Sequence, residues 1–287
     1  MRIKRAMGHR SQERSMSEKR SVAIAVTGAS GQVGKLVCRR LAETQIEVLP
    51  LDHGDDWADA IGKSDAVIHL AGTLQPKGRN SYDSANVQTT ATVVAAARES
   101  AVRRLIFLSY VGADTASPNA YLRSKALAEG LLIESGIPTT VFRCVHIYGP
   151  PGSPGPTAGA FIARGRRPVT VPGTGKQQIE PLYIGDVVDA VFGALERADA
   201  PTGIFDLGGP DRMTMDDFVR ALNSPGVRIR HIPPGLARML ARLSPSLTPA
   251  LMDLLLCDNV AAAPPAEIGR QFGFTPHRLA DVWASRR

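Results

Sequence analysis

A glycine-rich turn between an apolar run and an amphipathic segment constrains the fold of this chain more than any other feature. Val22–Val26 is apolar and rich in β-branched residues, which is typical of a buried strand. Gln32–Glu43 places its apolar residues at helical spacing, and Thr27–Gly34 joins the two segments with the pattern TGxxGxxG. A strand, a glycine turn and a helix in this order predict the phosphate-binding corner of a dinucleotide-binding α/β fold.

The three glycines of the turn have separate physical reasons. Gly28 permits a tight turn, Gly31 lets the backbone approach a pyrophosphate closely, and Gly34 lets the helix pack on the strand. The helix N-terminus adds free N–H groups and a partial positive charge for phosphates. A turn that serves packing alone is the alternative. The predicted dinucleotide contacts here are Gly28, Ser30, Gly31, Gln32, Val33 and Gly34.

Strands and helices continue to alternate as far as residue 142. The expected strands are Ile46–Leu51 and Ala66–Leu70, both buried, then Arg104–Leu108 and Thr139–Phe142; the expected helices are Ser84–Glu99 and Tyr121–Glu134. Such alternation favours right-handed crossovers and a parallel sheet. The predicted fold class is therefore α/β, a Rossmann-type doubly wound parallel sheet.

The character of the sequence changes after Tyr148. A loop rich in glycine and proline, Gly149–Pro156, is followed by shorter elements. These are strands near Val169–Val171 and at Ile204–Leu207, helices at Asp186–Glu196 and Met215–Leu222, and a helical stretch from Pro234 to Cys257. We expect a basic tail at 1–20, a dinucleotide-binding domain at 21–148, and a small substrate lobe at 149–287 that also returns elements to the first domain.

Most of the net charge of +7 belongs to the first twenty residues, where seven basic residues oppose two acidic ones. The tail has almost no apolar periodicity, so we expect it to be disordered, and it lacks the interleaved aromatic residues of a nucleic-acid-binding segment. No apolar run reaches the roughly 18 residues of a membrane-spanning helix. We therefore expect a small-molecule substrate, no nucleic-acid partner and no integral membrane segment.

Cys38, Cys144 and Cys257 lie far apart, without CxxC or Cys/His spacing. This predicts no metal site and no disulfide framework, and it fits a reducing cytoplasm. One helical stretch from Leu236 to Leu243 carries apolar residues on one face and arginines on another. Peripheral contact with a membrane and packing on a partner are two interpretations of that face; we favour the lining of a substrate pocket or the core of the lobe.

The spacing TGxxGxxG resembles the short-chain dehydrogenase/reductase superfamily, and other segments from 22 to about 285 support the resemblance. These are His69-Leu70-Ala71-Gly72, Asn86 at the start of a long helix, Ser109 at a strand end, the YxxxK motif Tyr121–Lys125, Gly149-Pro150, and Leu182–Val187. The chain looks most like the extended or atypical branch, close to the NAD(P)H-binding accessory subunit of respiratory complex I. The resemblance implies cofactor contacts at Leu70, Ala71, Gly72 and Asn86.

Asp52 ends the second expected strand, eighteen residues after Gly34. A carboxylate there accepts hydrogen bonds from ribose hydroxyls and repels a 2′-phosphate, so the predicted cofactor is NAD(P), with NAD favoured over NADP. Two alternatives remain open. Asp52 or Asp56 could act on the adenine side, because the segment looks as if one strand had been trimmed, or Asp52 could be a helix N-cap.

Tyr121 and Lys125 share a helix face at i and i+4. The resemblance implies that the tyrosine exchanges a proton with the substrate, while the lysine lowers its pKa and binds the nicotinamide ribose. Ser109 is the candidate third member, although Tyr110 and Val111 follow where a second serine is usual. The alternatives are a core tyrosine with a solvated lysine, and a serine that only caps a strand.

Arg143 and His146 follow the next strand and are further candidate cofactor contacts. Ile179 stands where nucleotide-sugar epimerases carry a phosphate-binding arginine, which disfavours a nucleotide-sugar substrate. We expect an oxidoreductase, or an epimerase/dehydratase, that acts on a small substrate other than a nucleotide sugar. The alternative is a non-catalytic dinucleotide-binding module with a structural or redox-sensing role. The oligomeric state has no signal in the sequence.

Overall fold

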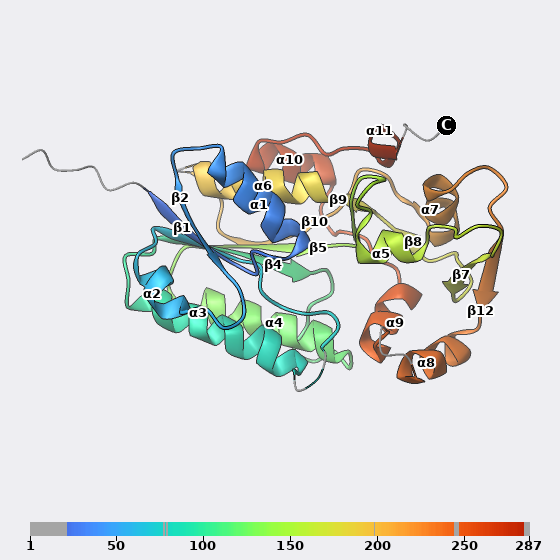
Figure 1. Ribbon diagram of the computed structural model, residues 1–287, viewed down its shortest axis with the longest axis horizontal. Helices are drawn as coiled ribbons and strands as arrows, with labels where there is room; N and C mark the ends of the chain where they lie inside the picture. The colour runs from blue at the N-terminus through green and yellow to red at the C-terminus, as the bar shows by residue number, and fades with distance from the viewer. Residues whose placement is uncertain (1–21, 77, 79, 198, 244–246, 284–287) are drawn as a thin grey trace, which may run out of the picture.

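A six-stranded parallel sheet forms the centre of the molecule (Figure 1). The computed structural model describes residues 22–76, 78, 80–197, 199–243 and 247–283, so the expected disorder at 1–20 lies outside the described residues. The strand order is β10-β5-β4-β3-β1-β2. Their bounds are β1 Ala23–Thr27, β2 Glu47–Leu51, β3 Ala66–His69, β4 Arg104–Tyr110, β5 Thr139–Cys144 and β10 Gly203–Leu207. The predicted Rossmann-type architecture is confirmed.

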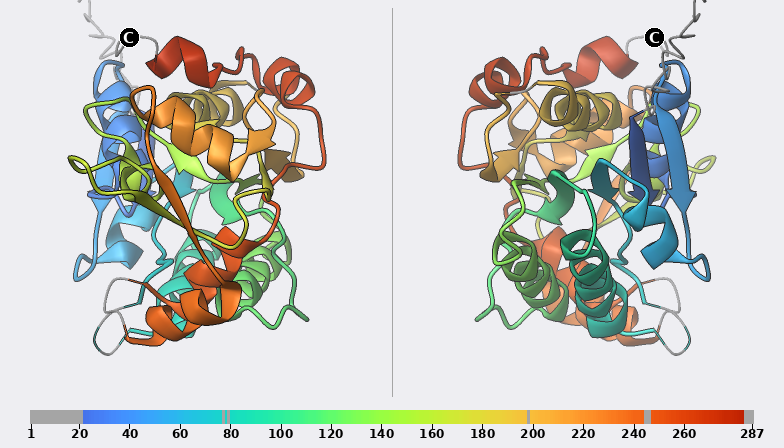
Figure 2. Two further views of the ribbon diagram at one scale, coloured as in Figure 1. Left: turned by 90° about the vertical axis from the view of Figure 1, so that its right-hand side faces the viewer. Right: turned by 90° about the vertical axis from the view of Figure 1, so that its left-hand side faces the viewer.

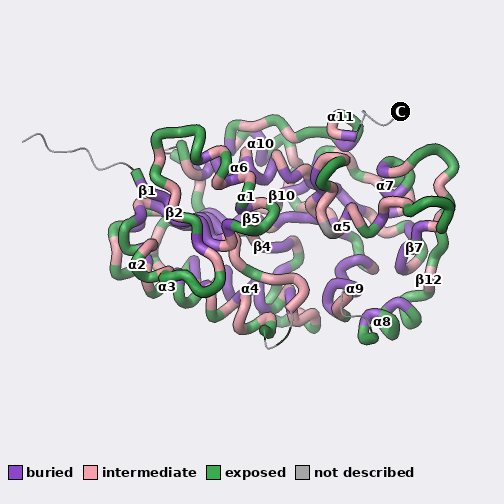
Figure 3. Tube along the Cα trace, in the orientation of Figure 1, coloured by how far each residue is buried: buried purple, intermediate pink, exposed green. Residues whose placement is uncertain are grey.

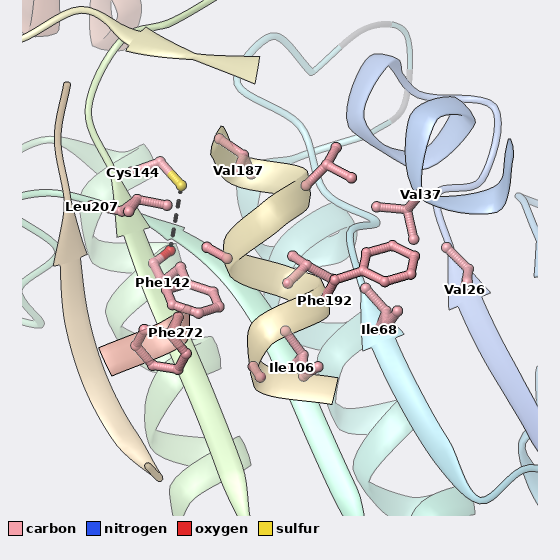
Figure 4. Close-up of a cluster of buried hydrophobic side chains, with 14 of the residues drawn as sticks. Val26, Val37, Ile68, Ile106, Phe142, Cys144, Val187, Phe192, Leu207 and Phe272 are labelled. Carbon is pink, nitrogen blue, oxygen red and sulfur yellow. Dashed lines mark hydrogen bonds between the residues drawn. The ribbon is translucent and has the colours of Figure 1, made fainter. Parts of the chain in front are cut away.

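Helices cover both faces of this sheet (Figures 1 and 2). On one face lie α1 Gln32–Ala42, α6 Ile184–Glu196 and α10 Pro265–Phe272; on the other lie α2 Trp57–Gly62, the π-helix η1 Asp83–Gln88 with α3 Thr89–Arg98, and α4 Ala120–Ile133. Phe192 of α6 packs between Val37 of α1 and Ile68 of β3 (Figure 4). Phe142 of β5 meets Phe272 edge-on, with ring centroids 4.8 Å apart. Residues far apart in sequence therefore share one core.

The register of the sheet brings three strand ends together. Thr27, the last residue of β1, lies beside Leu51 of β2 and His69 of β3. The glycine turn, the segment that begins at Asp52 and the segment that begins at Leu70 therefore leave from one edge. Open parallel sheets bind ligands at this edge.

One expectation about the elements was wrong, and two others are made more exact by the structure. β2 is an edge strand rather than a buried one: four of its five residues are at least partly exposed, because no strand of the described ranges pairs with its outer edge (Figure 3). The long helix expected from Ser84 begins as the π-helix η1. The stretch Pro234–Cys257 is two helices, α8 Pro234–Leu243 and α9 Pro249–Leu256, and a second proline opens α9.

The chain beyond Tyr148 has a second apolar core. Short strand pairs join β7 Val169–Pro172 to β12 Ile229–Ile232, β8 Gln178–Ile179 to β11 Met213–Thr214, and β6 Ile147–Tyr148 to β9 Leu182–Tyr183. The helices α5 Gly155–Ala160, α7 Met215–Leu222 and α11 Leu279–Trp283 accompany them. α6, β10 and α10 return to the large sheet, whereas the domain limits themselves stay a prediction. Across the described ranges, no helix is both long and apolar enough to cross a membrane.

Candidate functional site

The glycine turn is held so tightly that side chains would collide with backbone. Gly28 has φ +68°, and a Cβ there would lie 2.8 Å from the Ala71 nitrogen. A Cβ on Gly34 would lie 2.2 Å from the carbonyl oxygen of Gly28. Both contacts are far shorter than van der Waals distance, so the turn presses against the end of β3 on one side and against α1 on the other. The conformational reasons predicted for these two glycines are present in the structure.

The first turn of α1 offers its backbone N–H groups to a ligand. Gly31 is the N-cap, no described side chain caps the helix, and its first turn holds no acidic residue. The N–H groups of this turn have no partner within the helix, and the helix dipole adds partial positive charge. Gly155 at the start of α5 borders the turn, since a Cβ there would meet Oε1 of Gln32 at 3.2 Å. This arrangement fits a pyrophosphate.

Asp52 is attached to the same turn. Its carboxylate accepts hydrogen bonds from the Ser30 N–H at 3.1 Å and from the Ser30 hydroxyl at 2.9 Å. The N-cap of α2 is Asp56, which accepts from the N–H of Asp59 at 3.1 Å, so the alternative that Asp52 caps a helix is wrong. The role of Asp52 toward a ribose stays a prediction.

A buried hydrogen-bond chain lies behind the glycine turn, and sequence reasoning did not find it. His69 is fully buried, with Nδ1 2.7 Å from the Thr27 hydroxyl and Nε2 2.9 Å from the Thr90 hydroxyl. Thr90 donates to the Asn86 carbonyl oxygen at 2.6 Å, so Nε2 carries the proton toward Thr90 and Nδ1 accepts from Thr27. Burial lowers the pKa of His69 to about 3, which keeps the ring neutral.

Asn86 connects the two sides of the site. Its Oδ1 accepts from the Thr73 N–H at 2.8 Å, and its Nδ2 donates to the Ser124 hydroxyl at 2.9 Å. A Cβ on Gly72, which has φ +157°, would lie 2.8 Å from Oδ1 of Asn86. The segment after β3, which contains Leu70, Ala71 and Gly72, is thereby fixed to α4.

Tyr121 and Lys125 stand one turn apart on α4. The Asn119 side chain caps this helix and accepts from the Tyr121 N–H at 3.0 Å. Nζ of Lys125 donates to the Leu108 carbonyl oxygen at 2.6 Å and lies 4.0 Å from the ring centroid of Phe107. Burial lowers the pKa of Lys125 to about 8 and raises the pKa of Tyr121 above its ordinary value. The alternative of a solvated lysine is wrong, because Lys125 is 5% exposed.

Ser109 carries a buried hydroxyl that nothing in the described part of the chain satisfies. It is 5% exposed, and its Oγ has no hydrogen-bond partner among the described residues. Leu105 and Phe107 of β4 pack toward the α3/α4 face, and strand alternation places Ser109 on that same side. An orphaned hydroxyl here has the donor and acceptor capacity that a substrate carbonyl or hydroxyl requires.

Aromatic residues enclose Tyr121. Its ring meets Tyr110 edge-on at 5.7 Å between centroids and lies 5.9 Å from Tyr82. The Tyr110 hydroxyl is 2.9 Å from Nδ1 of His146, whose Nε2 is buried and lacks a partner among the described residues. Burial lowers the pKa of His146 to about 4, so this ring is neutral. Leu254 of α9 packs on the same cluster.

Arg143 has a structural partner. Its guanidinium donates to both carboxylate oxygens of Glu129 on α4, at 2.9 and 2.6 Å. A bidentate pair of this kind joins β5 to α4, so Arg143 has a structural role that requires no ligand. The expected contact of Arg143 with the cofactor stays a prediction.

The fold and this edge of the sheet define a dinucleotide-binding protein of the Rossmann class. The model of the NAD dependent epimerase/dehydratase family matches residues 24–208, a range that includes every strand of the six-stranded sheet almost in full. The chain belongs to that family.

Individual relatives are distant. The chain is 25% identical to NADH dehydrogenase (ubiquinone) 1 alpha subcomplex subunit 9, mitochondrial, of Arabidopsis thaliana, over 70% of this chain and 57% of that protein. It is 27% identical to the 2-alkyl-3-oxoalkanoate reductase of Stenotrophomonas maltophilia, over 88% and 94% of the two chains. The chain thus spans little more than half the length of the plant relative.

Solved structures share the fold. UDP-glucuronic acid 4-epimerase from Bacillus cereus, in complex with UDP-glucuronic acid and NAD, superposes with a TM-score of 0.69 at 19% identity, over 92% of this chain and 97% of that one. MoeE5 in complex with UDP-glucuronic acid and NAD gives 0.71 at 18% identity, over 92% and 97%. At these identities the likeness establishes the fold alone.

Proposed function

We propose that the protein is an NAD-dependent oxidoreductase that reduces the carbonyl group of a small substrate other than a nucleotide sugar. The observation that carries this proposal is the buried pair of Tyr121 and Lys125, with Nζ of Lys125 fixed by the Leu108 carbonyl oxygen. Lys125 is 5% exposed, and no carboxylate of the described residues is hydrogen-bonded to its ammonium group. Burial of its charged ammonium group is unfavourable in free energy, and such buried titratable groups are concentrated at functional sites.

The residues present fit a nicotinamide dinucleotide. The uncapped first turn of α1 would hold the pyrophosphate, and Asp52 would accept from the adenosine ribose. Asp55 and Asp56 follow Asp52, and this acidic segment would repel the 2′-phosphate of NADP. When bound, the nicotinamide would supply or accept a hydride. Affinities for NADH and NADPH measured side by side test the preference, and tighter NADPH binding would contradict it.

The protonation states favour reduction. Burial raises the pKa of Tyr121, so its hydroxyl stays protonated at neutral pH and can donate to a carbonyl oxygen that gains negative charge. Lys125 is not among the groups that shift the pKa of Tyr121, so the lowering implied by the resemblance is not present in this structure, and the role proposed for the lysine is to bind the nicotinamide ribose. Ser109 supplies a second donor from the same side of the sheet, because its hydroxyl has no other described partner.

The surroundings favour a small, apolar substrate. Tyr82, Tyr110 and Leu254 surround Tyr121, and they offer apolar surface rather than charge. The position expected to hold a phosphate-binding arginine in nucleotide-sugar enzymes is Ile179, which is fully buried. The bacterial relative named as a 2-alkyl-3-oxoalkanoate reductase is consistent with a carbonyl substrate.

Replacement of Tyr121 with Phe tests the proposal. A panel of 3-oxo acids, ketones and aldehydes is assayed with NADH, and the variant should bind NADH as the wild type does while turnover falls at least about a hundredfold. Tyr110→Phe is the matched control, because it removes a neighbouring hydroxyl from the same cluster. Equal turnover by wild type and Tyr121→Phe would refute the role of Tyr121.

A second candidate is a dinucleotide-binding module without catalysis. The observation in its favour is that Tyr110 packs edge-on against Tyr121 and thus occupies space beside it. The Tyr110 hydroxyl is in turn hydrogen-bonded to His146. This candidate predicts a thermal shift with NADH and no turnover across the whole panel, both for the wild type and for Tyr110→Ala. Turnover that appears only in Tyr110→Ala would identify a closed but competent site.

We also propose that the protein works in the cytoplasm. The three cysteines are far apart in the sequence and are free thiols in the structure, as expected under reducing conditions. Cell fractionation with an antibody to the chain tests this, and recovery in an oxidising or organellar compartment would contradict it.

A further inference from the structure

Helix α8 exposes an apolar stripe. Leu236, Met239, Leu240 and Leu243 have exposed fractions of 41%, 52%, 43% and 77%. Four of the eight large apolar residues that are exposed in the described chain are concentrated in this ten-residue helix. The favoured expectation that these residues line a pocket or the core of the lobe is therefore wrong. The concentration of exposed apolar side chains on one short helix, rather than their scatter over the surface, makes this face a candidate contact surface.

The opposite side of α8 explains why the stripe faces outward. Ala237 and Ala241 are buried and pack with Met252 of α9, so small residues attach the helix to the body. Spacing of three and four residues puts the four large side chains on a different face from these alanines. In Figures 1 and 3, α8 lies at a corner of the molecule, far from the sheet.

The charges on α8 have one sign. Arg238 and Arg242 occupy a third face, and the helix contains no acidic residue. Arg238 is paired with Asp253 of α9 at 2.7 Å, which leaves Arg242 as the helix's free cation among the described residues. Arg230 on the preceding strand, β12, adds another exposed cation. Apolar side chains flanked by arginines are the pattern of a helix that lies in a bilayer interface.

We propose that α8 docks the protein on the surface of an anionic lipid bilayer, with Leu236, Met239, Leu240 and Leu243 entering the interface. A second copy of the chain fits this surface less well. A ten-residue helix is about 15 Å long and about 10 Å wide, so its stripe presents roughly 150 Å². A stable interface needs about 800 Å² from each partner. A two-fold contact through α8 would also bring like charges together.

Vesicle flotation tests the proposal on the full chain. The probes are vesicles of phosphatidylcholine alone and vesicles with about 30% phosphatidylglycerol. The wild type should float with the anionic vesicles, more weakly at high salt and weakly with neutral ones. Met239→Gln/Leu243→Gln should lower the partition coefficient at least about tenfold, and Arg242→Gln should lower it a few-fold on anionic vesicles only.

Matched controls keep the test decisive. Leu127→Gln/Ile133→Gln removes two other exposed apolar side chains, both on α4, and Arg270→Gln removes an exposed arginine from α10; both variants should bind as the wild type does. The basic segment 1–20 is present in the wild type and in every variant, so its contribution to lipid binding cancels when their partition coefficients are compared. The proposal is overturned if the wild type does not float, if Met239→Gln/Leu243→Gln floats equally well, or if that variant instead abolishes a dimer seen by light scattering.

Discussion

Replacement of Gly34 with Ala tests the geometry of the phosphate-binding turn most directly. The new Cβ would lie 2.2 Å from the Gly28 carbonyl oxygen and 2.8 Å from that of Ala29, and both are backbone atoms. To reach an ordinary contact of about 3.5 Å, α1 must move away from the turn by more than about 1 Å. Val37 and Leu41 of α1 are fully buried in the core, so the helix moves only at the expense of its packing.

Overpacking of this kind costs about 1–3 kcal/mol of unfolding free energy. The first-turn N–H groups of α1 move with the helix, so affinity for NADH should fall at least about tenfold, which corresponds to about 1.4 kcal/mol. Gly130→Ala is the control. Gly130 lies inside α4, and a Cβ there would meet nothing within 4 Å. The same substitution should stabilise the protein at that position by about 0.5–1 kcal/mol.

Urea denaturation gives the two free energies, and calorimetric titration with NADH gives the affinities. The geometry predicts opposite signs for the two glycine-to-alanine changes and an affinity loss for Gly34→Ala alone. A Gly34→Ala variant that is as stable as the wild type and binds NADH equally well would refute the reasoning about the turn. Loss of stability with unchanged affinity would separate the packing role of Gly34 from ligand binding.

Three further predictions concern buried titratable groups. Arg143→Met leaves the 4%-exposed Glu129 carboxylate without its partner and should cost about 3 kcal/mol in urea denaturation, most of which the double variant Glu129→Leu/Arg143→Met should regain; additive losses would contradict the pair. Burial lowers the pKa of His69 to about 3, so the folded chain binds fewer protons than the unfolded chain between pH 6.5 and 3. The free energy of unfolding should then decrease as the pH is lowered from 6.5 to 3. Thermal melts of His69→Gln over the same range should show a weaker dependence of stability on pH. Because the pKa of Lys125 is lowered to about 8, the rate of carbonyl reduction should fall as pH rises past about 8, and a rate that stays constant to pH 10 would exclude the ammonium from the reaction.

The features that the sequence predicted well are local ones. The bounds of α1 and the strained glycines depend on residues within one strand–turn–helix unit, and the structure places both where the pattern predicted them. The burial of β2 was predicted wrongly, because a strand's neighbours across the sheet are not encoded in its own residues. Ile46–Leu51 has the apolar composition of a central strand, and only the missing outer strand makes it an edge.

The candidate site shows the same division. Tyr121 and Lys125 were found because both lie on one helix at i and i+4. The hydrogen bonds from Thr27 through His69 to Thr90 join three separate elements, so no short sequence motif contains all three residues. The His69-Leu70-Ala71-Gly72 segment was a usable signal, since a polar ring at the end of a buried strand must find partners.

The two halves of the proposed site consist of different chemical groups, and the difference bears on how the proposed reaction starts. The cofactor half uses backbone N–H groups and a neutral histidine, so its geometry is independent of pH near neutrality. The proposed catalytic half contains titratable groups in an apolar setting, where burial disfavours both tyrosinate and ammonium. Oxidation of an alcohol would have to begin from the disfavoured tyrosinate, whereas reduction of a carbonyl begins from the neutral tyrosine. At neutral pH the enclosed Tyr121 is therefore in the protonated form from which carbonyl reduction starts.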